Sequence, residues 1–462
     1  MPSLWLYTGK GTKMSIFQAC DIRGIAGKDL TDVMARRIAL AIGVKLAGQT
    51  VVVGGDIRLS TPGLQRIMID GLAESGCQVI DIGTVPTPVF YYAVKATGAT
   101  GGVMVTASHN PAPYNGFKLI LGPEPVSEAD VAQIGQLVAE NIRTQGAGSI
   151  VQRPVIADYI AHTAGKARPG RLKVVLDAGN GATAAIAPKL FQRLGYEVIP
   201  LNCVADGRFP NHPPNPALAE NLVSLGEAVR FHGAALGIGF DGDGDRVGFV
   251  DETGQAIDND AIMVLIAKAC LARQTGAVIY DAKCSMVVPE AVTEAGGRPV
   301  MARAGHTFSK AAFIREQALF AGEISGHFFF RDLGYDDGMF SGLKICELVA
   351  DRGCLSAQVA AIPRYLLTPD IRVPYKGRDK TAILEQVAVR LAVYEPNLID
   401  GVRIEFADGW GMIRASVTEP LFTLRFEAKT AARLNEIKTM LLNALPVDIQ
   451  AAVIAKLPAE LQ

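Results

Sequence analysis

The sequence predicts an α/β protein of three related α/β domains with mixed, mostly parallel sheets, followed by a C-terminal α+β domain. Short runs rich in valine and isoleucine alternate with longer helical patterns, and this alternation is typical of βαβ units. An apolar strand that ends in aspartate also recurs three times, at 51–56, 174–177 and 278–281. This recurrence predicts three copies of one kind of domain.

A loop rich in small and polar residues lies downstream of each of these strands, after a second strand. The three loops are 106–111, 241–246 and 322–327. The aspartates lie about one domain length (~100–150 residues) apart, which excludes a short solenoid repeat. Open sheets bind ligands at the carboxyl ends of their strands, so we expect each loop to contribute to a site.

The chain length and a late change of pattern predict the domain boundaries. A chain of 462 residues is too long for one hydrophobic core, because single cores stop growing near ~250–300 residues. After Pro363 the pattern becomes that of a smaller α+β domain. We expect a disordered tail at 1–13 and domains at 14–150, 151–255, 256–367 and 368–462, with Met14 as an alternative natural start.

The composition is that of an ordinary globular protein, with 49% hydrophobic and 20% charged residues. The 45 basic residues match the 46 acidic ones, so no global charge attracts nucleic acid or an anionic membrane. No apolar run reaches the ~18–20 residues of a membrane span, and the N-terminus lacks the pattern of a signal peptide. The seven cysteines form no CxxC pair. We therefore expect a cytoplasmic protein with reduced thiols. We also expect a monomer or weak dimer, although none of these features determines the oligomeric state.

The loop Asp241–Arg246 carries three carboxylates at alternate positions, with glycines that let it curl. Three close carboxylates are costly without a cation, and hard oxygen ligands suit Mg²⁺. A solvent-exposed acidic turn is the simple alternative, but two strand-like runs flank the loop. An EF-hand is excluded by Arg246 at its sixth position and by those strands. A haloacid-dehalogenase-like loop is excluded by Asp245 at its fifth position.

The loop Thr106–Pro111 presents Ser108 next to His109, with Lys118 a short way downstream. A serine becomes a phosphate carrier where cations and hydrogen-bond donors surround it. By itself the segment could equally be a turn that caps a helix. The chain has no G-x-S-x-G elbow, which argues against an acyl-transfer serine.

Two further loops carry polar residues at alternate positions, where extended backbone points them the same way. Glu323 and Ser325 could hold two neighbouring sugar hydroxyls, although a β-turn with a surface glutamate explains them as well. Arg414, Ser416 and Thr418 could clamp a phosphate, although an exposed strand edge is the alternative. Other basic groups at loop positions are Arg23, Arg58, Lys283 and His306.

Together these motifs resemble the α-D-phosphohexomutase superfamily, and within it the bacterial phosphomannomutase/phosphoglucomutase type. The resemblance runs from about Ile16 to the end of the chain, with the motifs in the order of the family. They are Asp21-Ile22-Arg23-Gly24, T-A-S-H-N-P, D-G-D-G-D-R, G-E-x-S-G-H and R-x-S-x-T-E-P. Five motifs in order make a chance match implausible.

The resemblance implies four domains around a central cleft, each giving one loop, and a role for each motif. Ser108 would be the phosphoserine, and Mg²⁺ would bind its phosphate with Asp241, Asp243 and Asp245. Glu323 and Ser325 would hold sugar hydroxyls, and Arg414, Ser416 and Thr418 the non-reacting phosphate. Charge stabilisation or proton transfer would come from Arg23, His109, Lys118, Arg246, His306 and His327, and further substrate contacts from Lys283 and Arg58.

The implied reaction interconverts hexose 1-phosphate and hexose 6-phosphate, with mannose, glucose or both as the hexose. Phospho-Ser108 gives its phosphate to the sugar, and the resulting hexose 1,6-bisphosphate turns over and returns its other phosphate to Ser108. The bisphosphate is thus both the intermediate and the activator of unphosphorylated enzyme. Mg²⁺ and the cations neutralise the transferring group.

Some positions depart from the usual motifs of the family or bear on the sugar. Cys20 stands where these mutases often carry an aromatic residue, and Val417 where asparagine or glycine is common. Phosphoglucosamine mutase is an alternative, but its usual glutamine and aspartate are replaced by Ile324 and Tyr114. Mannose and glucose differ only at C2, for which the sequence gives no clear contact.

Two alternatives come from other functional classes. A metal-dependent sugar phosphatase would use the aspartate loop and release free phosphate from glucose 1-phosphate without forming glucose 6-phosphate. A catalytically silent sugar-phosphate-binding protein would never carry phosphate on Ser108.

Overall fold

The computed structural model describes residues 16–18, 21–375, 377, 379–416 and 421–457. The chain forms two compact units, Met1–Ile262 with Ser325–Val359, and Met263–Ile324 with Ala360–Gln462. The tail expected at 1–13, the alternative start at Met14, and the positions Cys20, Val417 and Thr418 lie outside the described residues.

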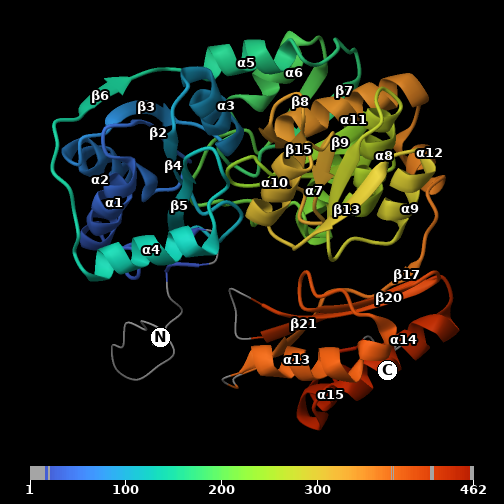
Figure 1. The fold of residues 1–462 in the computed structure, drawn as a ribbon. Helices are drawn as coiled ribbons and strands as arrows, with labels where there is room; N and C mark the ends of the chain where they lie inside the picture. The colour runs from blue at the N-terminus through green and yellow to red at the C-terminus, as the bar shows by residue number, and fades with distance from the viewer. Residues whose placement is uncertain (1–15, 19–20, 376, 378, 417–420, 458–462) are drawn as a thin grey trace. The chain divides into compact units, whose positions relative to one another are not determined.

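The first unit begins with a six-stranded sheet in the order β1-β5-β4-β2-β3-β6. Strands β2, β3, β4 and β6 run parallel, while β5 is antiparallel to β4 and β1. Helices α1, α2 and α4 gather on one side of this sheet and α3 lies on the other (Figure 1). The strands are β1 (Ile22–Ile25), β2 (Thr50–Gly55), β3 (Gln78–Thr84), β4 (Gly101–Val105), β5 (Tyr114–Leu121) and β6 (Ser149–Gln152). The helices are α1 (Asp32–Leu46), α2 (Thr61–Glu74), α3 (Thr87–Thr97) and α4 (Glu128–Ala139).

Local chemistry fixes where these helices begin. Thr31 accepts a hydrogen bond from the N–H of Met34 at the start of α1, and Ser127 and Asp130 form a reciprocal capping box at the start of α4. Helices α2 and α3 begin with proline in the first turn, where no N–H is needed.

A second sheet of the first unit has the order β11-β10-β9-β7-β8. Strand β7 is parallel to β8 and β9, and β10 returns antiparallel to β9 with Val247 opposite Phe240. The loop 241–246 is therefore the tip of a hairpin. The strands are β7 (Lys173–Asp177), β8 (Glu197–Leu201), β9 (Leu236–Phe240), β10 (Val247–Asp251) and β11 (Ala256–Ile257). The helices are α5 (Ile156–Ala164), α6 (Ala187–Arg193), η1 (Ala219–Leu222) and α7 (Val223–His232).

The segment 325–359 also belongs to the first unit. It forms the antiparallel pair β15 (Phe328–Phe330) and β16 (Tyr335–Asp336), followed by α11 (Gly338–Arg352) and α12 (Leu355–Ala360). Helix α11 packs against β9 and β10, and its Gly342 faces Ile238 and Phe191 so closely that a side chain there would meet both. The compact units thus divide the chain within the predicted third domain, at 324/325.

The second unit contains a parallel set of strands in the order β13-β12-β14 and an antiparallel sheet in the order β17-β21-β20-β19, with β18 also paired to β21. The parallel strands are β12 (Ala277–Asp281), β13 (Arg298–Ala302) and β14 (Phe320–Gly322), with helices α9 (Val287–Glu294) and α10 (His306–Arg315). Helix α8 (Asn259–Leu271) runs from the first unit into the second.

The antiparallel part ends the chain and has its own hydrophobic core, built from its strands and helices α13 to α15. Its strands are β17 (Leu366–Leu367), β18 (Ile371–Pro374), β19 (Val402–Phe406), β20 (Gly409–Ala415) and β21 (Leu421–Ala428). Its helices are α13 (Lys380–Arg390), η2 (Ala392–Tyr394), α14 (Ala431–Ala444) and α15 (Val447–Ile454). The predicted fold class, α/β domains followed by an α+β domain, is confirmed.

The three strand-end aspartates noted in the sequence share one arrangement. In each, Oδ1 accepts the N–H of the residue two positions on, and Oδ2 accepts a hydrogen bond from a segment distant in sequence. The first contacts are Asp56 with Arg58 at 2.9 Å, Asp177 with Gly179 at 2.8 Å and Asp281 with Lys283 at 2.7 Å. The second contacts are Asp56 with Thr106 at 2.7 Å, Asp177 with His212 at 3.0 Å and Asp281 with the N–H of Ile324 at 2.9 Å.

Within the described ranges, none of the helices combines the length and the apolar character that crossing a membrane requires.

The environment of Asp337 allows a prediction of how the stability of the first unit depends on pH. This fully buried residue caps α11, and it accepts hydrogen bonds from the N–H of Phe340 at 3.0 Å and from Tyr159 Oη at 2.7 Å. Burial raises its pKa from 3.8 to about 7. Because the folded pKa is raised, the stability that this group contributes is full below pH 3.8 and is lost as pH rises through about 7.

We therefore expect the stability of the wild type relative to Asp337→Asn to fall by up to about 1.4 kcal/mol per pH unit on going from pH 5 to 7. Thermal unfolding of both proteins by calorimetry from pH 5 to 8 measures this difference. Asparagine keeps an oxygen that can accept from Tyr159, so the two proteins are matched in shape. A difference in unfolding midpoint that stays constant over this pH range would contradict the assignment.

Candidate active site

The serine loop follows β4 and holds Ser108 in a strained position. Ser108 is 1% exposed and has a φ of 50°, a left-handed conformation that residues other than glycine seldom adopt. In this conformation its Oγ donates a hydrogen bond to Asp241 Oδ2 at 2.7 Å and lies 3.3 Å from His109 Nδ1. The serine loop and the aspartate loop therefore meet at a single hydroxyl.

The aspartate loop turns sharply between β9 and β10, helped by Gly244 at a φ of 78°. The curl turns the N–H groups of Gly244 and Arg246 toward Asp241 Oδ1, at 2.8 and 3.2 Å. The three carboxylates of Asp241, Asp243 and Asp245 are fully buried, and their ligand oxygens lie within 4.8 Å of one another. The sequence prediction that this loop gathers its carboxylates is consistent with this geometry.

One ammonium group faces these carboxylates. Lys118 Nζ, on β5, lies 2.9 Å from Asp243 Oδ2 and also pairs with Asp245 Oδ2. Burial alone would lower the pKa of Lys118, but Asp243 and Asp245 outweigh burial and raise it well above 10.5. Lys118 is therefore a permanent cation in this site.

The pKa values of Asp241 and Asp243 are shifted in opposite directions. Burial and the charges of its two neighbours raise the pKa of Asp241 well above its usual range. Burial also acts to raise the pKa of Asp243, but Lys118 and a 2.6 Å hydrogen bond from Thr87 Oγ1 bring it below its usual range. A set of three carboxylates with one adjacent ammonium leaves negative charge that a divalent cation would neutralise.

The donor set fits Mg²⁺. All three protein ligands would be carboxylate oxygens, which are the ligands that this ion prefers. Asp243 Oδ1 is buried and accepts no hydrogen bond from any residue that the structure describes. An inward-facing carboxylate oxygen of this kind is suited to a metal ion. Asp241, Asp243 and Asp245 would hold the ion, together with the oxygen that Ser108 presents.

Two imidazoles border the carboxylates, the buried one of His327 and the half-buried one of His109. His327 Nε2 accepts from Arg246 Nε at 2.9 Å, and its Nδ1 lies 2.8 Å from Asp336 Oδ2. Burial and the charge of Arg246 lower the pKa of His327 to about 4, although Asp336 opposes this shift. Burial, Arg246 and Arg23 similarly lower the pKa of His109 well below 6.5. Both rings are therefore neutral at neutral pH.

Arg23 lies beside the same serine loop. Its Nη1 donates to Asn110 Oδ1 at 2.6 Å, and its Nε pairs with Asp21 Oδ2 at 2.7 Å. The first unit thus brings together most of the residues that the sequence singled out: Arg23, Ser108, His109, Lys118, Asp241, Asp243, Asp245, Arg246 and His327. Ser325 belongs to this unit as well.

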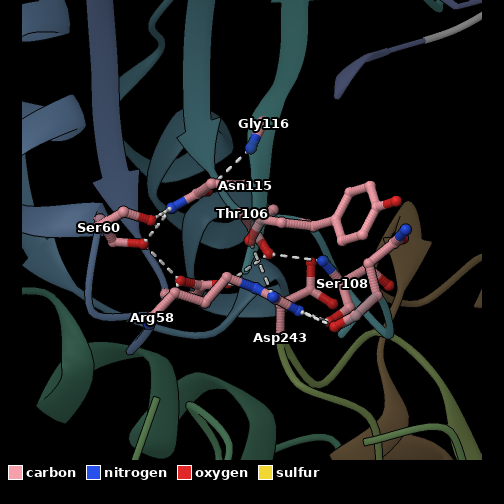
Figure 2. A network of polar contacts seen from close by, with 12 residues as sticks. Arg58, Ser60, Thr106, Ser108, Asn115, Gly116 and Asp243 are labelled. Atoms are coloured by element: carbon pink, nitrogen blue, oxygen red, sulfur yellow. Dashed lines mark hydrogen bonds and ion pairs between the residues drawn. The ribbon is translucent and has the colours of Figure 1, made fainter. Parts of the chain in front are cut away.

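Arg58 has a different environment from the one expected for a substrate ligand. It is fully buried, and its side-chain N–H groups are directed to four backbone carbonyls and to Asp56. Figure 2 shows its guanidinium directed toward the backbone of Ser108. Each N–H of this guanidinium has an acceptor inside the domain, and the adjacent buried Asp56 compensates its charge. These contacts do not support the expected substrate contact of Arg58, which stays a prediction.

The second unit holds the remaining candidates. Glu323 follows β14 and is 3% exposed, and the neighbouring N–H of Ile324 donates to Asp281. The N–H of Lys283 donates to the same aspartate, while its Nζ lies 3.6 Å from Asp370 Oδ2. His306 begins α10, directly after Gly305 with a φ of 133°.

The phosphate-clamp candidates lie at the end of β20 in the second unit. Arg414 Nε lies 3.0 Å from Asp400 Oδ2, which also accepts the N–H of Ala304 at 3.1 Å. Lys380 Nζ donates to the carbonyl of Ser416 at 2.6 Å, so a second cation lies beside this segment. Thr418 is outside the described residues.

Several residues of these sites were missed from sequence. Thr87 and Asp336 contact Asp243 and His327, and Asp400 and Lys380 contact Arg414 and Ser416. Thr87 follows Pro86 at the start of a helix, where threonine is an ordinary residue, and Asp336 lies in a two-residue strand. Nothing local in the sequence distinguishes these four residues.

Comparisons with known proteins agree with this geometry. Four families described as phosphoglucomutase/phosphomannomutase match the chain in order: alpha/beta/alpha domain I at 14–145, domain II at 157–254, domain III at 258–365 and the C-terminal domain at 371–444.

Relatives match over nearly their whole length. A phosphomannomutase/phosphoglucomutase of Pseudomonas aeruginosa is 42% identical over 443 residues, which cover 93% of this chain and 95% of the relative. A phosphoglucomutase of Neisseria gonorrhoeae is 38% identical, covering 92% and 95%. The crystal structure of a phosphoglucomutase/phosphomannomutase family protein from Burkholderia thailandensis is similar with a TM-score of 0.86 at 36% identity, covering 93% of this chain and 96% of the other. With four domain matches in sequence order and relatives of this similarity, the chain belongs to the phosphoglucomutase/phosphomannomutase family.

Proposed function

We propose that this protein is a phosphohexomutase that interconverts hexose 1-phosphate and hexose 6-phosphate, with mannose, glucose or both as substrates. The observation that carries the proposal is the 2.7 Å hydrogen bond from Ser108 Oγ to Asp241 Oδ2. It joins a potential phosphate carrier to a buried group of carboxylates suited to a metal ion. Two relatives bear the names phosphomannomutase/phosphoglucomutase and phosphoglucomutase, which supports mannose and glucose phosphates as the substrate class.

In the first half of the reaction, the phosphate on Ser108 passes to the free O1 or O6 of a hexose monophosphate. The bond from Ser108 Oγ to phosphorus breaks as the sugar oxygen bonds to phosphorus, and one proton passes from the sugar hydroxyl to Ser108 Oγ. Asp241, Asp243, Asp245 and the Ser108 phosphate would hold Mg²⁺, which when bound would neutralise the transferring group. Lys118 from β5 and Arg23 from β1 add fixed positive charge beside the aspartate loop and the serine loop.

In the second half, the hexose 1,6-bisphosphate has turned so that its other phosphate faces Ser108. Ser108 Oγ gives up its proton and attacks this phosphate, and the sugar oxygen leaves and takes up a proton. The serine proton has two acceptors within reach, Asp241 Oδ2 at 2.7 Å and the neutral His109 Nδ1 at 3.3 Å. The serine is phosphorylated again at the end of each cycle, and free bisphosphate primes the enzyme by the same step.

The remaining candidates bind the part of the substrate that does not react. We assign the sugar hydroxyls to Glu323 and Ser325, and the non-reacting phosphate to Arg414, Ser416 and Thr418. Lys283 and Arg246 add positive charge around the sugar phosphate, and His306 and His327 are available for proton transfer. The arrangement of four domains about a central cleft, a cytoplasmic location and a monomer or weak dimer stay predictions.

Replacing the carrier tests the function directly. Incubation with glucose 1,6-bisphosphate should add one phosphate to the wild type, detected by intact mass, and none to Ser108→Ala. The conversion of glucose 1-phosphate to glucose 6-phosphate should fall by about 10³-fold or more, because the nucleophile is lost. The exposed Ser149→Ala is the matched control and should behave as the wild type. Release of free phosphate without glucose 6-phosphate would instead indicate a phosphatase.

Removing the charge of one carboxylate tests whether the three aspartates bind a metal ion. Asp243→Asn removes a charge from the oxygen that accepts no hydrogen bond in the described part of the chain, so the Mg²⁺ concentration for half-maximal activity should rise by about tenfold or more. Titration with Mn²⁺ by calorimetry gives a second, independent measure. Asp206→Asn, which alters a surface pair with Arg208 in the same unit, is the control. Equal metal dependence in the wild type and Asp243→Asn would exclude this metal site.

The identity of the sugar requires a comparison of substrates. With Ile324 and Tyr114 in place of the residues usual in phosphoglucosamine mutases, we expect kcat/KM for the mannose and glucose phosphates to exceed that for glucosamine phosphate. Coupled assays on the three 1-phosphates measure this ratio. A preference for glucosamine phosphate would favour the alternative assignment.

A further inference from the structure

The contacts of Arg58 are concentrated on one loop. All of its guanidinium nitrogens donate, and Figure 2 shows the group among the residues that frame Ser108. Nη2 donates to the carbonyls of Ser108 at 2.7 Å and Asn110 at 2.6 Å, Nη1 to those of Pro111 at 2.8 Å and Tyr114 at 2.9 Å, and Nε to Asp56 Oδ2 at 3.1 Å. Arg58 thus holds four carbonyls between positions 108 and 114 with one rigid planar group.

The backbone N–H of Ser108 is held by Thr106, which in turn is held by Asp56. Asp56 Oδ2 accepts from Thr106 Oγ1 at 2.7 Å, and Thr106 Oγ1 in turn accepts the N–H of Ser108 at 2.9 Å. The carbonyl of Ser108 is held by Arg58. The N–H and the C=O of the serine are therefore both connected to the end of β2, one through Thr106 and the other through Arg58.

The conformation that this network holds is an unfavourable one for serine. A φ of 50° is left-handed, and an L-residue other than glycine persists there only when its surroundings determine it. Gly242 of the aspartate loop lies so close that a Cβ there would be 2.5 Å from the carbonyl oxygen of Ser108. A rotation of the Ser108 peptide would therefore move the hydroxyl away from Asp241 and disturb the aspartate loop as well.

The network is closed to substrate and water. Asp56 and Arg58 are 1% and 0% exposed, and the ring of Phe209 lies 5.0 Å from the guanidinium carbon. A Cβ at Gly207 would be 2.5 Å from the carbonyl of Ile57, so the segment around 207–209 lies directly on the backbone before Arg58. The arginine contacts no reacting group, and any effect it has on the reaction passes through the serine loop.

We propose that Arg58 is a positioning residue for phosphoryl transfer, which fixes Ser108 in the left-handed conformation that aims its Oγ at Asp241. This inference rests on the proposed function, because it concerns the step in which Ser108 exchanges phosphate. Lysine cannot replace the arginine, since one ammonium cannot reach four carbonyls and a carboxylate in the same plane. The network thus acts on the rate of transfer more than on the affinity for sugar phosphate, whose proposed contacts lie elsewhere.

The test measures the rate constant of one step. Wild type, Arg58→Lys and Arg58→Met are phosphorylated, and transfer from phospho-Ser108 to glucose 1-phosphate is followed in a single turnover with Mg²⁺. A rate constant, unlike an amplitude, does not depend on the fraction of active protein. We expect Arg58→Lys to lower it by about 10²-fold, the size that a displacement near 1 Å produces, with little change in KM. The exposed Arg66→Met, which removes a charge paired with Asp70 on α2, is the control.

A second pair of variants covers the case in which the Arg58 variants do not fold. Thr106→Val keeps the shape of the side chain but removes the hydroxyl that joins Asp56 to the N–H of Ser108, and Thr106→Ser keeps that hydroxyl. We expect Thr106→Val to slow the same transfer and Thr106→Ser to recover most of the loss.

The outcomes separate the inference from the proposed function. A folded Arg58→Lys that melts at a lower temperature but transfers phosphate at the rate of the wild type overturns the inference, because the arginine is then only structural. Equal rate constants for Thr106→Val and the wild type also overturn it. A wild type that never phosphorylates Ser108 and never forms glucose 6-phosphate contradicts the proposed function itself.

Discussion

The first unit is organised around buried negative charge. Asp241, Asp243 and Asp245 lie within one hairpin tip with no exposure to water, and carboxylates in that situation require compensation from the protein or from an ion. The parts that supply it come from separate elements: Lys118 from β5, the hydroxyl of Thr87 from α3 and the hydroxyl of Ser108 from the loop after β4. Compensation of this buried charge brings the hydroxyl of Ser108 to the three carboxylates.

The fold class and the loops of the candidate site could be predicted from the sequence because they depend on local sequence patterns. Alternating apolar runs and helical periods predicted the fold class, and alternate aspartates between two strands predicted a curled loop with gathered carboxylates. The strand-end positions of Ser108 and Asp241 predicted that their loops would contribute to a site. Strand ends are readable in a sequence because turns interrupt the apolar runs there.

The rest depended on contacts between residues far apart in the chain. Arg58 was expected among the substrate contacts that the family resemblance implies, but Asp56 and four carbonyls between 108 and 114 accept its hydrogen bonds inside the domain. Asp336 orients His327, and Asp400 pairs with Arg414, although neither aspartate lies in a recognisable motif. Asp336 and Asp400 lie outside the strand-end pattern that includes Asp56, so the sequence did not indicate that they support His327 and Arg414.

The aspartates at the ends of β2, β7 and β12 have a consequence for how such a protein can change. Each carboxylate uses one oxygen to close its own turn and the other to hold a segment distant in sequence, through Thr106, His212 or Ile324. These paired contacts of each aspartate are therefore separate from the side chains proposed to bind substrate or metal. The side chains of Ser108, Asp241 and Glu323 take no part in these contacts, so those side chains can change while each aspartate keeps its turn and its distant segment in place.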